Sequence, residues 1–172
     1  MSTIQSVLGI SEADFVNLMD SNCTLKGACL GYAAEYIAKK SLESTSGVLE
    51  VIKMSDHDRE HRYDFLVKTR CGNIRVEVKR LTESASGVKV AKNYKSTMEV
   101  AGHTICTNQL LKTSYDVLCI VTPNGVVYMK TCDIPIHGNY KKYPTEVTSL
   151  LLPRFLRASI IQQQASSDFP LT

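Results

Sequence analysis

Residues 73–81, Asn-Ile-Arg-Val-Glu-Val-Lys-Arg-Leu, decide the fold, because apolar and charged side chains alternate along them. Successive side chains of a β-strand point to opposite faces of a sheet, so one set enters a core and the other faces away from it. The set predicted to enter the core is Ile74, Val76 and Val78. Glu77 and Lys79 are expected on the opposite face, about 7 Å apart along the strand. The segment therefore predicts a half-buried strand that carries an acid and a base together.

A second strand is expected directly before this one, over residues 63–69, joined to it by a short turn. The two strands would form a β-hairpin. With a turn of two or three residues, Asp64 falls across from Val78 or Lys79, within a residue or two of Glu77. Two carboxylates this close repel each other, and a divalent cation is the usual compensation. Because Mg²⁺ prefers carboxylates together with water and phosphate oxygens, the pair indicates a site for phosphate chemistry.

These residues resemble the PD-(D/E)XK nuclease superfamily, which has the restriction-endonuclease-like fold. Asp64 matches the first acid of the motif, and Glu77-Val78-Lys79 matches its E-x-K element. The resemblance covers residues 25–130, and it includes a helix before the hairpin and an apolar strand after it, over residues 115–121. The chain departs from the pattern at Tyr63, where the family often has proline.

The resemblance implies an α/β fold with a restriction-endonuclease-like mixed β-sheet core flanked by helices. It also implies the roles of the site residues in a metal-dependent endonuclease. Asp64 and Glu77 would hold Mg²⁺, with Mn²⁺ as a substitute, and Lys79 would assist the attacking water. Many members of the superfamily place a glutamate on the helix before the hairpin, which makes Glu35 the candidate third catalytic acid and third metal ligand.

The E-x-K element alone is weak evidence, since composition predicts about one acid-x-Lys triplet by chance in a chain of this kind. Its placement carries the hypothesis: the triplet lies mid-strand, with apolar residues on the opposite face and an acid on the preceding strand. The alternative is an ordinary solvated hairpin face, on which Glu77 pairs with one of three cations: Lys79, Arg75 or Lys68. For Glu35 the alternative is an exposed ion pair with Lys39, four residues along the helix.

Apolar periodicity predicts the remaining elements. Helices are expected from a cap at Ser11 to a break at Asn22, and over residues 25–40, 104–113 and 145–163. Further strands are expected over residues 48–54, 117–122 and 126–130. The helix at 25–40 carries an apolar stripe made of Leu25, Cys29, Tyr32, Ala33, Tyr36 and Ile37. Around Glu35 it also carries small residues that would let the helix approach the sheet closely: Ala28, Gly31, Ala34 and Ala38.

The chain has 172 residues, of which 44% are hydrophobic and 22% charged, and its net charge is +3. These values exclude a disordered or collagen-like protein, and no apolar run is long enough to span a bilayer. We expect one nuclease-like domain over residues 1–164 and a flexible tail over residues 165–172. The first residues lack a secretory leader, so we expect free cysteines and a cytoplasmic, nucleoid or nuclear protein that is not secreted.

Lysine-rich segments are the candidate contacts to nucleic acid. They follow the strand at 73–81 and recur later in the chain: Lys89, Lys92, Lys95, Lys112, Lys141 and Lys142. Such side chains bind DNA phosphates. We expect double-stranded DNA as the partner, with no membrane and no organic cofactor. A compact enzyme is expected to act as a homodimer, because two-fold symmetry lets it address both strands.

Two classes of function fit these observations. The first is a metal-dependent endodeoxyribonuclease that hydrolyses phosphodiester bonds, in a compact site-specific form of the restriction or homing type. The second is a non-catalytic module that binds nucleic acid or protein, with Glu77 and Lys79 as a surface pair. A structure-selective nuclease for junctions or repair and an RNA-cleaving relative are further alternatives.

Overall fold

The structure is a computed structural model that describes residues 3–56, 61, 63–84, 87–90, 97–100, 103–106, 110–111, 114–134, 149–150 and 167–171. Side chains are described for residues 5–56, 61, 63–81, 114–134 and 167–171. The chain divides into two compact units, Met1–Ala33 and Ala34–Thr172. Among the described helices, none combines the length and the apolar character needed to cross a bilayer. Every cysteine whose side chain is described is a free thiol.

The first unit is helical. Helix α1 spans Thr3–Leu8, and α2 spans Glu12–Ser21. Ser11 caps α2 as predicted, because its hydroxyl oxygen accepts the Asp14 N–H at 3.1 Å. The side chain of Asn22 accepts the Leu25 N–H at 2.9 Å and so begins the next helix, which confirms the break predicted at this residue.

Helix α3 spans Cys23–Glu43, and its last ten residues belong to the second unit. The face that it buries is small and aliphatic: Ala34, Ala38 and Leu42. The apolar stripe of the sequence is therefore not the buried face, since Tyr36 and Ile37 are 61% and 46% exposed. Small side chains let the helix axis approach the sheet closely, whereas a tyrosine at the surface keeps its hydroxyl in water. Packing distance, rather than the number of apolar residues, selects the buried face.

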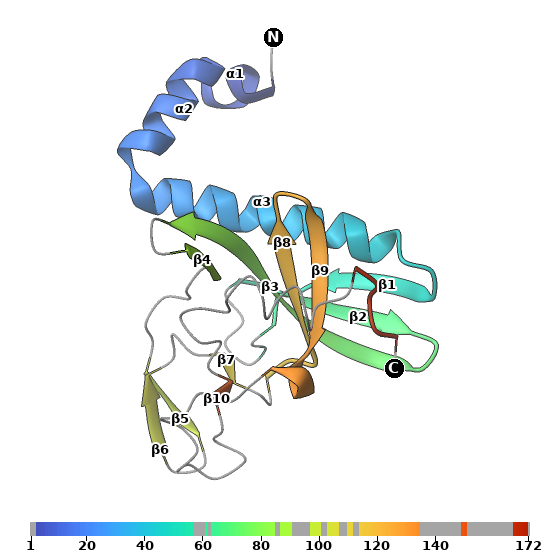
Figure 1. The fold of residues 1–172 in the computed structure, drawn as a ribbon. Helices are drawn as coiled ribbons and strands as arrows, with labels where there is room; N and C mark the ends of the chain where they lie inside the picture. Colours follow the sequence, from blue (N-terminus) through green and yellow to red (C-terminus); the bar gives the residue numbers. More distant parts are fainter. Residues whose placement is uncertain are drawn as a thin grey trace. The chain divides into compact units, whose positions relative to one another are not determined.

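The second unit is built on one mixed sheet with the order β1-β2-β3-β8-β9, in which β4 also pairs with β3 (Figure 1). The bounds are Val48–Lys53 for β1, Phe65–Thr69 for β2, Gly72–Ser84 for β3, Gly87–Val90 for β4, Val117–Thr122 for β8 and Gly125–Lys130 for β9. Strand β3 pairs antiparallel with β2 and parallel with β8. The other pairings are antiparallel. The predicted α/β fold with a mixed sheet is confirmed.

The segment after β4 differs from the sequence expectation. Residues 104–113 were predicted to be helical, but β6 spans His103–Cys106 and β7 spans Leu110–Leu111. Strand β6 pairs with β5, Thr97–Val100, while β7 pairs with β10, Ser149–Leu150. The β-branched side chains of Thr104 and Ile105 favour this extended backbone. The helix predicted over 145–163 is likewise wrong at Ser149 and Leu150, and its other residues lie outside the described part of the chain.

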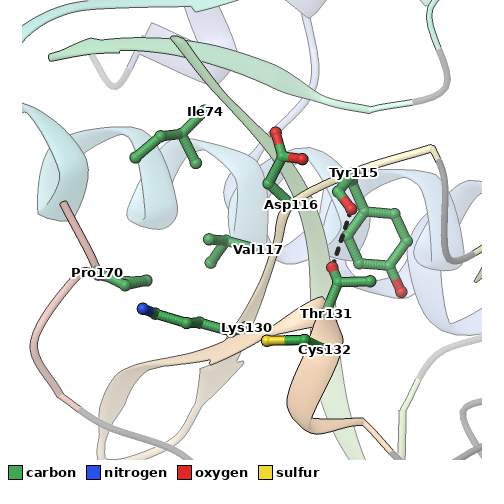
Figure 2. A pocket seen from close by; sticks show the side chains of 8 residues that line it. All are labelled: Ile74, Tyr115, Asp116, Val117, Lys130, Thr131, Cys132 and Pro170. Carbon is green, nitrogen blue, oxygen red and sulfur yellow. Dashed lines mark hydrogen bonds between the residues drawn. The ribbon is translucent and has the colours of Figure 1, made fainter. Parts of the chain in front are cut away.

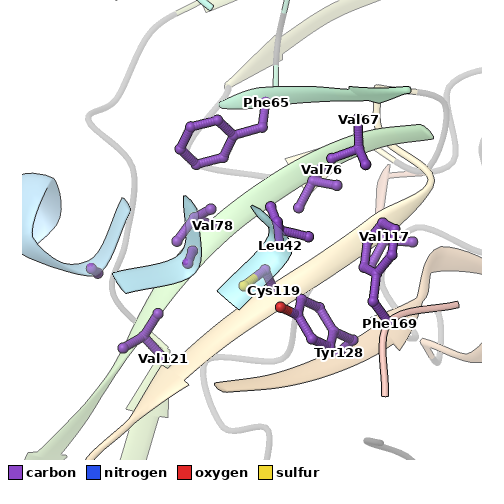
Figure 3. Close-up of a cluster of buried hydrophobic side chains, with 12 residues drawn as sticks. Leu42, Phe65, Val67, Val76, Val78, Val117, Cys119, Val121, Tyr128 and Phe169 are labelled. Atoms are coloured by element: carbon purple, nitrogen blue, oxygen red, sulfur yellow. The ribbon is translucent and has the colours of Figure 1, made fainter. Parts of the chain in front are cut away.

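Two apolar clusters cover the two faces of the sheet. The first lies between the sheet and α3, and Figure 3 shows side chains of Phe65, Val67, Val76 and Val78 gathered around Leu42. The second covers the opposite face: Tyr115, Leu118, Ile120, Met129 and Ile134. Strand β8 contributes alternate residues to both clusters, as its continuous apolar run predicts for a strand buried on two sides. Glu77 and Lys79, which pair with β8 residues of the second cluster, therefore lie in apolar surroundings.

The chain's last residues contribute to the first cluster. Phe169 is 6% exposed, and its ring meets that of Tyr128 edge-on at 5.2 Å between centroids. The burial of Phe169 does not fit the flexible tail expected over residues 165–172. A single anchoring aromatic leaves no periodic signal in so short a segment, so the sequence pattern could not indicate it.

Replacement of Phe169 by alanine tests this anchor. The substitution should lower the free energy of unfolding by about 3 kcal/mol, because it leaves a cavity against Tyr128. Leu49→Ala is the matched control: its side chain is 63% exposed, so the expected change is below about 0.5 kcal/mol. Urea denaturation measures both, and equal effects of the two substitutions would show that Phe169 does not anchor the tail.

Candidate active site

The hairpin that carries the predicted site turns on two residues, Arg70 and Cys71, between β2 and β3. The register places Thr69 opposite Gly72 and Phe65 opposite Val76. Gly72 has φ +138°, a backbone conformation that favours glycine. The two-residue turn agrees with the prediction, but the register is shifted from the predicted pairing of Asp64 with Val78 or Lys79. Asp64 still lies within a residue or two of Glu77, as predicted.

Asp64 nevertheless reaches Val78 with its side chain. Its N–H donates to the Val76 carbonyl at 3.0 Å, so Asp64 and Phe65 both lie against Val76. Two residues facing one is the pattern of a β-bulge, which changes the direction of a side chain. The Asp64 Oδ2 atom accepts the Val78 N–H at 2.7 Å, and its carbonyl accepts the Met54 N–H at 2.9 Å. Backbone bonds from both neighbouring strands therefore fix the position of this acid.

Glu77 and Lys79 form a direct hydrogen-bonded ion pair. Their side chains are only 7% and 11% exposed, so the alternative of a pair on a solvated face is wrong, although the pairing itself is present. Burial opposes the charge on Lys79, but the negative charges of Glu77 and Asp64 outweigh burial and raise the pKa of Lys79. Lys79 is therefore held as a protonated ammonium group close to two carboxylates.

Tyr115 closes the site on the side of the second cluster. The residue is 1% exposed, and its hydroxyl oxygen has no hydrogen-bond partner among the described residues. Burial, and then the charge of Glu77, raises the pKa of the Tyr115 hydroxyl. The Tyr115 hydroxyl thus stays protonated and neutral. The sequence pattern did not indicate that Tyr115 lies near Glu77, because Tyr115 comes two residues before β8 begins.

Glu35 lies on α3 and pairs with Lys53 rather than with Lys39. Its Oε2 atom is 3.0 Å from the Lys53 ammonium nitrogen, whereas Lys39 pairs with Glu43 at 3.5 Å. The contact with Lys53 is an ion pair without hydrogen-bond geometry, and this buried oxygen has no hydrogen-bond partner within the described residues. Burial and then the charge of Asp64 raise the pKa of Glu35.

Lys53 is the charged residue that sequence reasoning missed. It is the last residue of β1, opposite Phe65, and it also donates to Asp56 at 2.7 Å. Burial opposes its charge, but the hydrogen bond to Asp56 and the ion pair with Glu35 outweigh burial and raise the pKa of Lys53. Strand alternation could have indicated which face of the sheet Lys53 occupies. Val51 lies two residues earlier on the same face of β1, and it packs against the first apolar cluster.

The predicted metal ligands are not gathered into one group. Among the described residues, no three His, Cys, Asp or Glu side chains lie close enough together to hold a metal ion. The structure brings Asp64 to the backbone beside Glu77 and pairs Glu35 with Lys53. The arrangement offers two carboxylates near Lys79 and a third that a lysine already neutralises.

The other cations proposed as partners of Glu77 have different partners in the structure. Lys68 pairs with Glu50 at 2.7 Å. Arg75 forms a two-pronged contact with Asp116, with distances of 3.1 Å from Nε to Oδ2 and 2.7 Å from the terminal nitrogen to Oδ1. The Arg75 N–H also donates to Asp116 Oδ2 at 2.8 Å, and the Asp116 N–H donates to the Arg75 carbonyl at 2.9 Å. These four bonds fix the start of β8 beside β3.

An open groove of about 460 Å³ lies next to this Arg75–Asp116 contact, at the start of β8 and the end of β9 (Figure 2). Its walls are formed by Ile74, Tyr115, Asp116, Val117, Lys130, Thr131, Cys132 and Pro170. The four predicted catalytic residues do not line it. The candidate site is therefore the charged group around Asp64, and the groove is a separate feature.

The predicted nucleic-acid contacts cannot be placed. Lys89 is part of β4, but its side chain is outside the described set. The other five lysines lie outside the described residues altogether: Lys92, Lys95, Lys112, Lys141 and Lys142. Their contact with nucleic acid stays a prediction.

Comparison with known proteins does not assign the chain to a family. No protein-family model matches the chain, and no curated protein sequence matches it. A solved structure that is similar to it is that of a bacterial homing endonuclease, I-Ssp6803I. The two chains are 16% identical with a TM-score of 0.39, and the match covers 69% of this chain and 68% of that chain. At this TM-score the likeness carries no argument, so function must be argued from the residues.

The buried pair can be tested with Glu77→Gln and Lys79→Met, made singly and together. Each single substitution leaves the other charge buried without its partner, so the free energy of unfolding should fall by about 3–5 kcal/mol. The double variant should lose clearly less than the sum of the two. Denaturant unfolding of the four proteins measures this coupling, and strictly additive losses would show that the two side chains do not depend on each other.

Asp116→Asn should make the free energy of unfolding depend less steeply on pH under acid conditions. Burial raises the pKa of Asp116, but the Arg75 guanidinium outweighs burial and holds that pKa below its usual range. An acid with a lowered folded-state pKa stabilises the fold above its unfolded pKa of about 3.9, and that stability is lost as pH falls through the folded value. The parent should therefore lose stability more steeply below about pH 4 than the variant. Thermal unfolding across this range measures the slopes, and parallel curves would contradict the assignment.

Proposed function

We propose that the protein is a metal-dependent endonuclease of the PD-(D/E)XK type that hydrolyses phosphodiester bonds in double-stranded DNA. One observation carries the proposal. The Asp64 carboxylate is bonded to the backbone N–H of Val78, the residue between Glu77 and Lys79. Two acids and a protonated lysine therefore lie close together just before β2 begins, where β3 continues beside β8.

The residues present fit a divalent cation. The donors are carboxylate oxygens, the ligands that Mg²⁺ and Mn²⁺ prefer, and Asp64 and Glu77 would hold the ion. Two carboxylates in apolar surroundings favour the uptake of positive charge. When bound, the ion would lower the pKa of a water molecule and stabilise negative charge on the phosphate.

The chain's own groups have separate tasks in this proposal. Asp64 is held by three backbone bonds and so needs little rearrangement to act as a ligand. Lys79 is protonated, since the nearby carboxylates raise its pKa. It would donate to the phosphate or to the water and neutralise developing charge, rather than remove a proton. Glu35 would complete the acidic pocket from α3, with Lys53 balancing its charge.

The substrate and assembly follow from the same proposal. The proposed substrate is double-stranded DNA, cut at specific sites by an enzyme of the restriction or homing type, with a homodimer addressing both strands. The chain's net charge of +3 is compatible with a polyanionic partner. Structure-selective cleavage and RNA cleavage would use the same charged group. Assays with junction DNA and with RNA as substrates distinguish these activities from site-specific cleavage of double-stranded DNA.

The second candidate function is a non-catalytic binding module. One observation favours it: Glu77 and Lys79 already satisfy each other in a buried pair, which also occurs as a purely structural device. Such a module would bind nucleic acid without a metal requirement, and its affinity would fall steeply with salt.

Plasmid cleavage tests the proposed function. Purified protein should cut DNA with Mg²⁺ or Mn²⁺ and not with EDTA. Asp64→Asn, Glu77→Ala and Lys79→Ala should each slow cleavage by about 100-fold or more, because each removes charge placed for the transition state. Glu50→Gln is the matched control, since Glu50 pairs with Lys68 on the same sheet, away from the site.

The products and the variants decide between the candidates. Discrete fragments would support a site-specific enzyme, and a smear would indicate non-specific or structure-selective cleavage. Unchanged cleavage by the Glu77 and Lys79 variants would contradict the proposal. If the parent neither cuts DNA nor binds Mn²⁺ in calorimetry, the non-catalytic module is supported instead.

A further inference from the structure

The charged group around Asp64 has two halves, each with its own lysine. In one half, Lys79 pairs with Glu77. In the other half, Lys53 bridges Glu35 and Asp56, at 3.0 and 2.7 Å. Asp64 joins the two halves, because its carbonyl accepts the N–H of Met54, the residue after Lys53, at 2.9 Å, and its carboxylate accepts the N–H of Val78, between Glu77 and Lys79, at 2.7 Å.

Lys53 is placed as a fixed cation rather than as a mobile surface lysine. Its side chain is 32% exposed and spans from the end of β1 to α3, with the ammonium nitrogen 5.9 Å from the centre of the Phe65 ring. The Phe65 face contributes a weak attraction of its own. Two carboxylates, one from α3 and one following β1, then hold the ammonium in place.

The charges of the group limit how many ions it can accept. Among the described residues, the carboxylates and the ammonium groups of the group carry formal charges that sum to −2: Glu35, Asp56, Asp64 and Glu77 against Lys53 and Lys79. One divalent ion brings this to zero, whereas two ions would leave an excess of positive charge beside two lysines. The Oε2 atom of Glu35 already faces the Lys53 ammonium group at 3.0 Å. The described residues also offer no third carboxylate grouped with Asp64 and Glu77.

We propose that Lys53 is a positioning residue that stands in place of a second cation: its ion pair with Glu35 restricts the site to one divalent ion, held by Asp64 and Glu77. This inference rests on the proposed function and adds the number of ions and the residue that sets it. Without Lys53, the carboxylates of Glu35 and Asp56 have no cation between them and become ligands for a second ion.

Calorimetric titration of the full-length protein with Mn²⁺ at neutral pH tests this without any cleavage measurement. The parent should bind one ion per chain, and Lys53→Met should bind two. Lys53→Arg keeps the charge and should bind one. Lys68→Met is the matched control, because Lys68 pairs with Glu50, a glutamate outside the charged group, at 2.7 Å, and it should bind one. Thermal unfolding of each variant without metal shows whether it is folded.

Each outcome has a definite meaning. Two ions in the parent, or one ion in both the parent and Lys53→Met with unchanged affinity, would overturn the inference and leave the proposed function in place. Two ions in Lys53→Arg would show that the charge of Lys53 is not the cause and would also overturn it. No Mn²⁺ binding by the parent, with Asp64→Asn indistinguishable from it, would overturn the inference and the proposed function together.

Discussion

The hydrogen bond from the Val78 N–H to the Asp64 carboxylate is the contact on which the site depends. It lies just before β2 begins, where β3 continues beside β8, so the Asp64 side chain takes a backbone donor that β2 does not pair. A bond of this kind to a charged acceptor is worth about 1.5–3 kcal/mol. It fixes the Asp64 carboxylate beside Glu77 and Lys79, the two residues on either side of Val78. The bulge at Val76 is the backbone feature that makes the contact possible.

The second constraint is the cost of charge in apolar surroundings. Glu77 and Lys79 share a sheet face with the cluster around Leu118 and Ile120, where few water molecules can solvate them. A well-packed apolar pair at these positions would often be as stable or more stable. Proteins keep such groups mainly where function requires them. The burial of this pair is therefore better explained by a charged ligand than by stability alone.

Much of the second unit could be predicted from residue patterns. The alternation along residues 73–81 gave the two faces of β3 correctly, since Val76 and Val78 enter the core and Glu77 and Lys79 lie on the other face. The continuous apolar run of β8 indicated burial on both sides. These predictions succeed because strand periodicity is a local property of the chain.

The failures have a different origin, because they depend on long-range packing. The buried face of α3 is set by how closely the helix meets the sheet, which favours Ala34 and Ala38 over the larger aromatic side chains. A change of one residue in the turn shifts the register of the whole hairpin. Lys53 was missed because its partners, on α3 and beyond β1, come together only in the folded chain. The sequence therefore indicated the acids and the lysine of the E-x-K element but not their electrostatic surroundings.

The most direct measurement is a crystal structure of the protein soaked in Mn²⁺, with an anomalous difference map recorded at the manganese absorption edge. The account predicts one peak for each chain, bonded to carboxylate oxygens of Asp64 and Glu77, with Lys53 still paired to Glu35. A map with no peak near Asp64, or with a peak between Glu35 and Asp56, would contradict it.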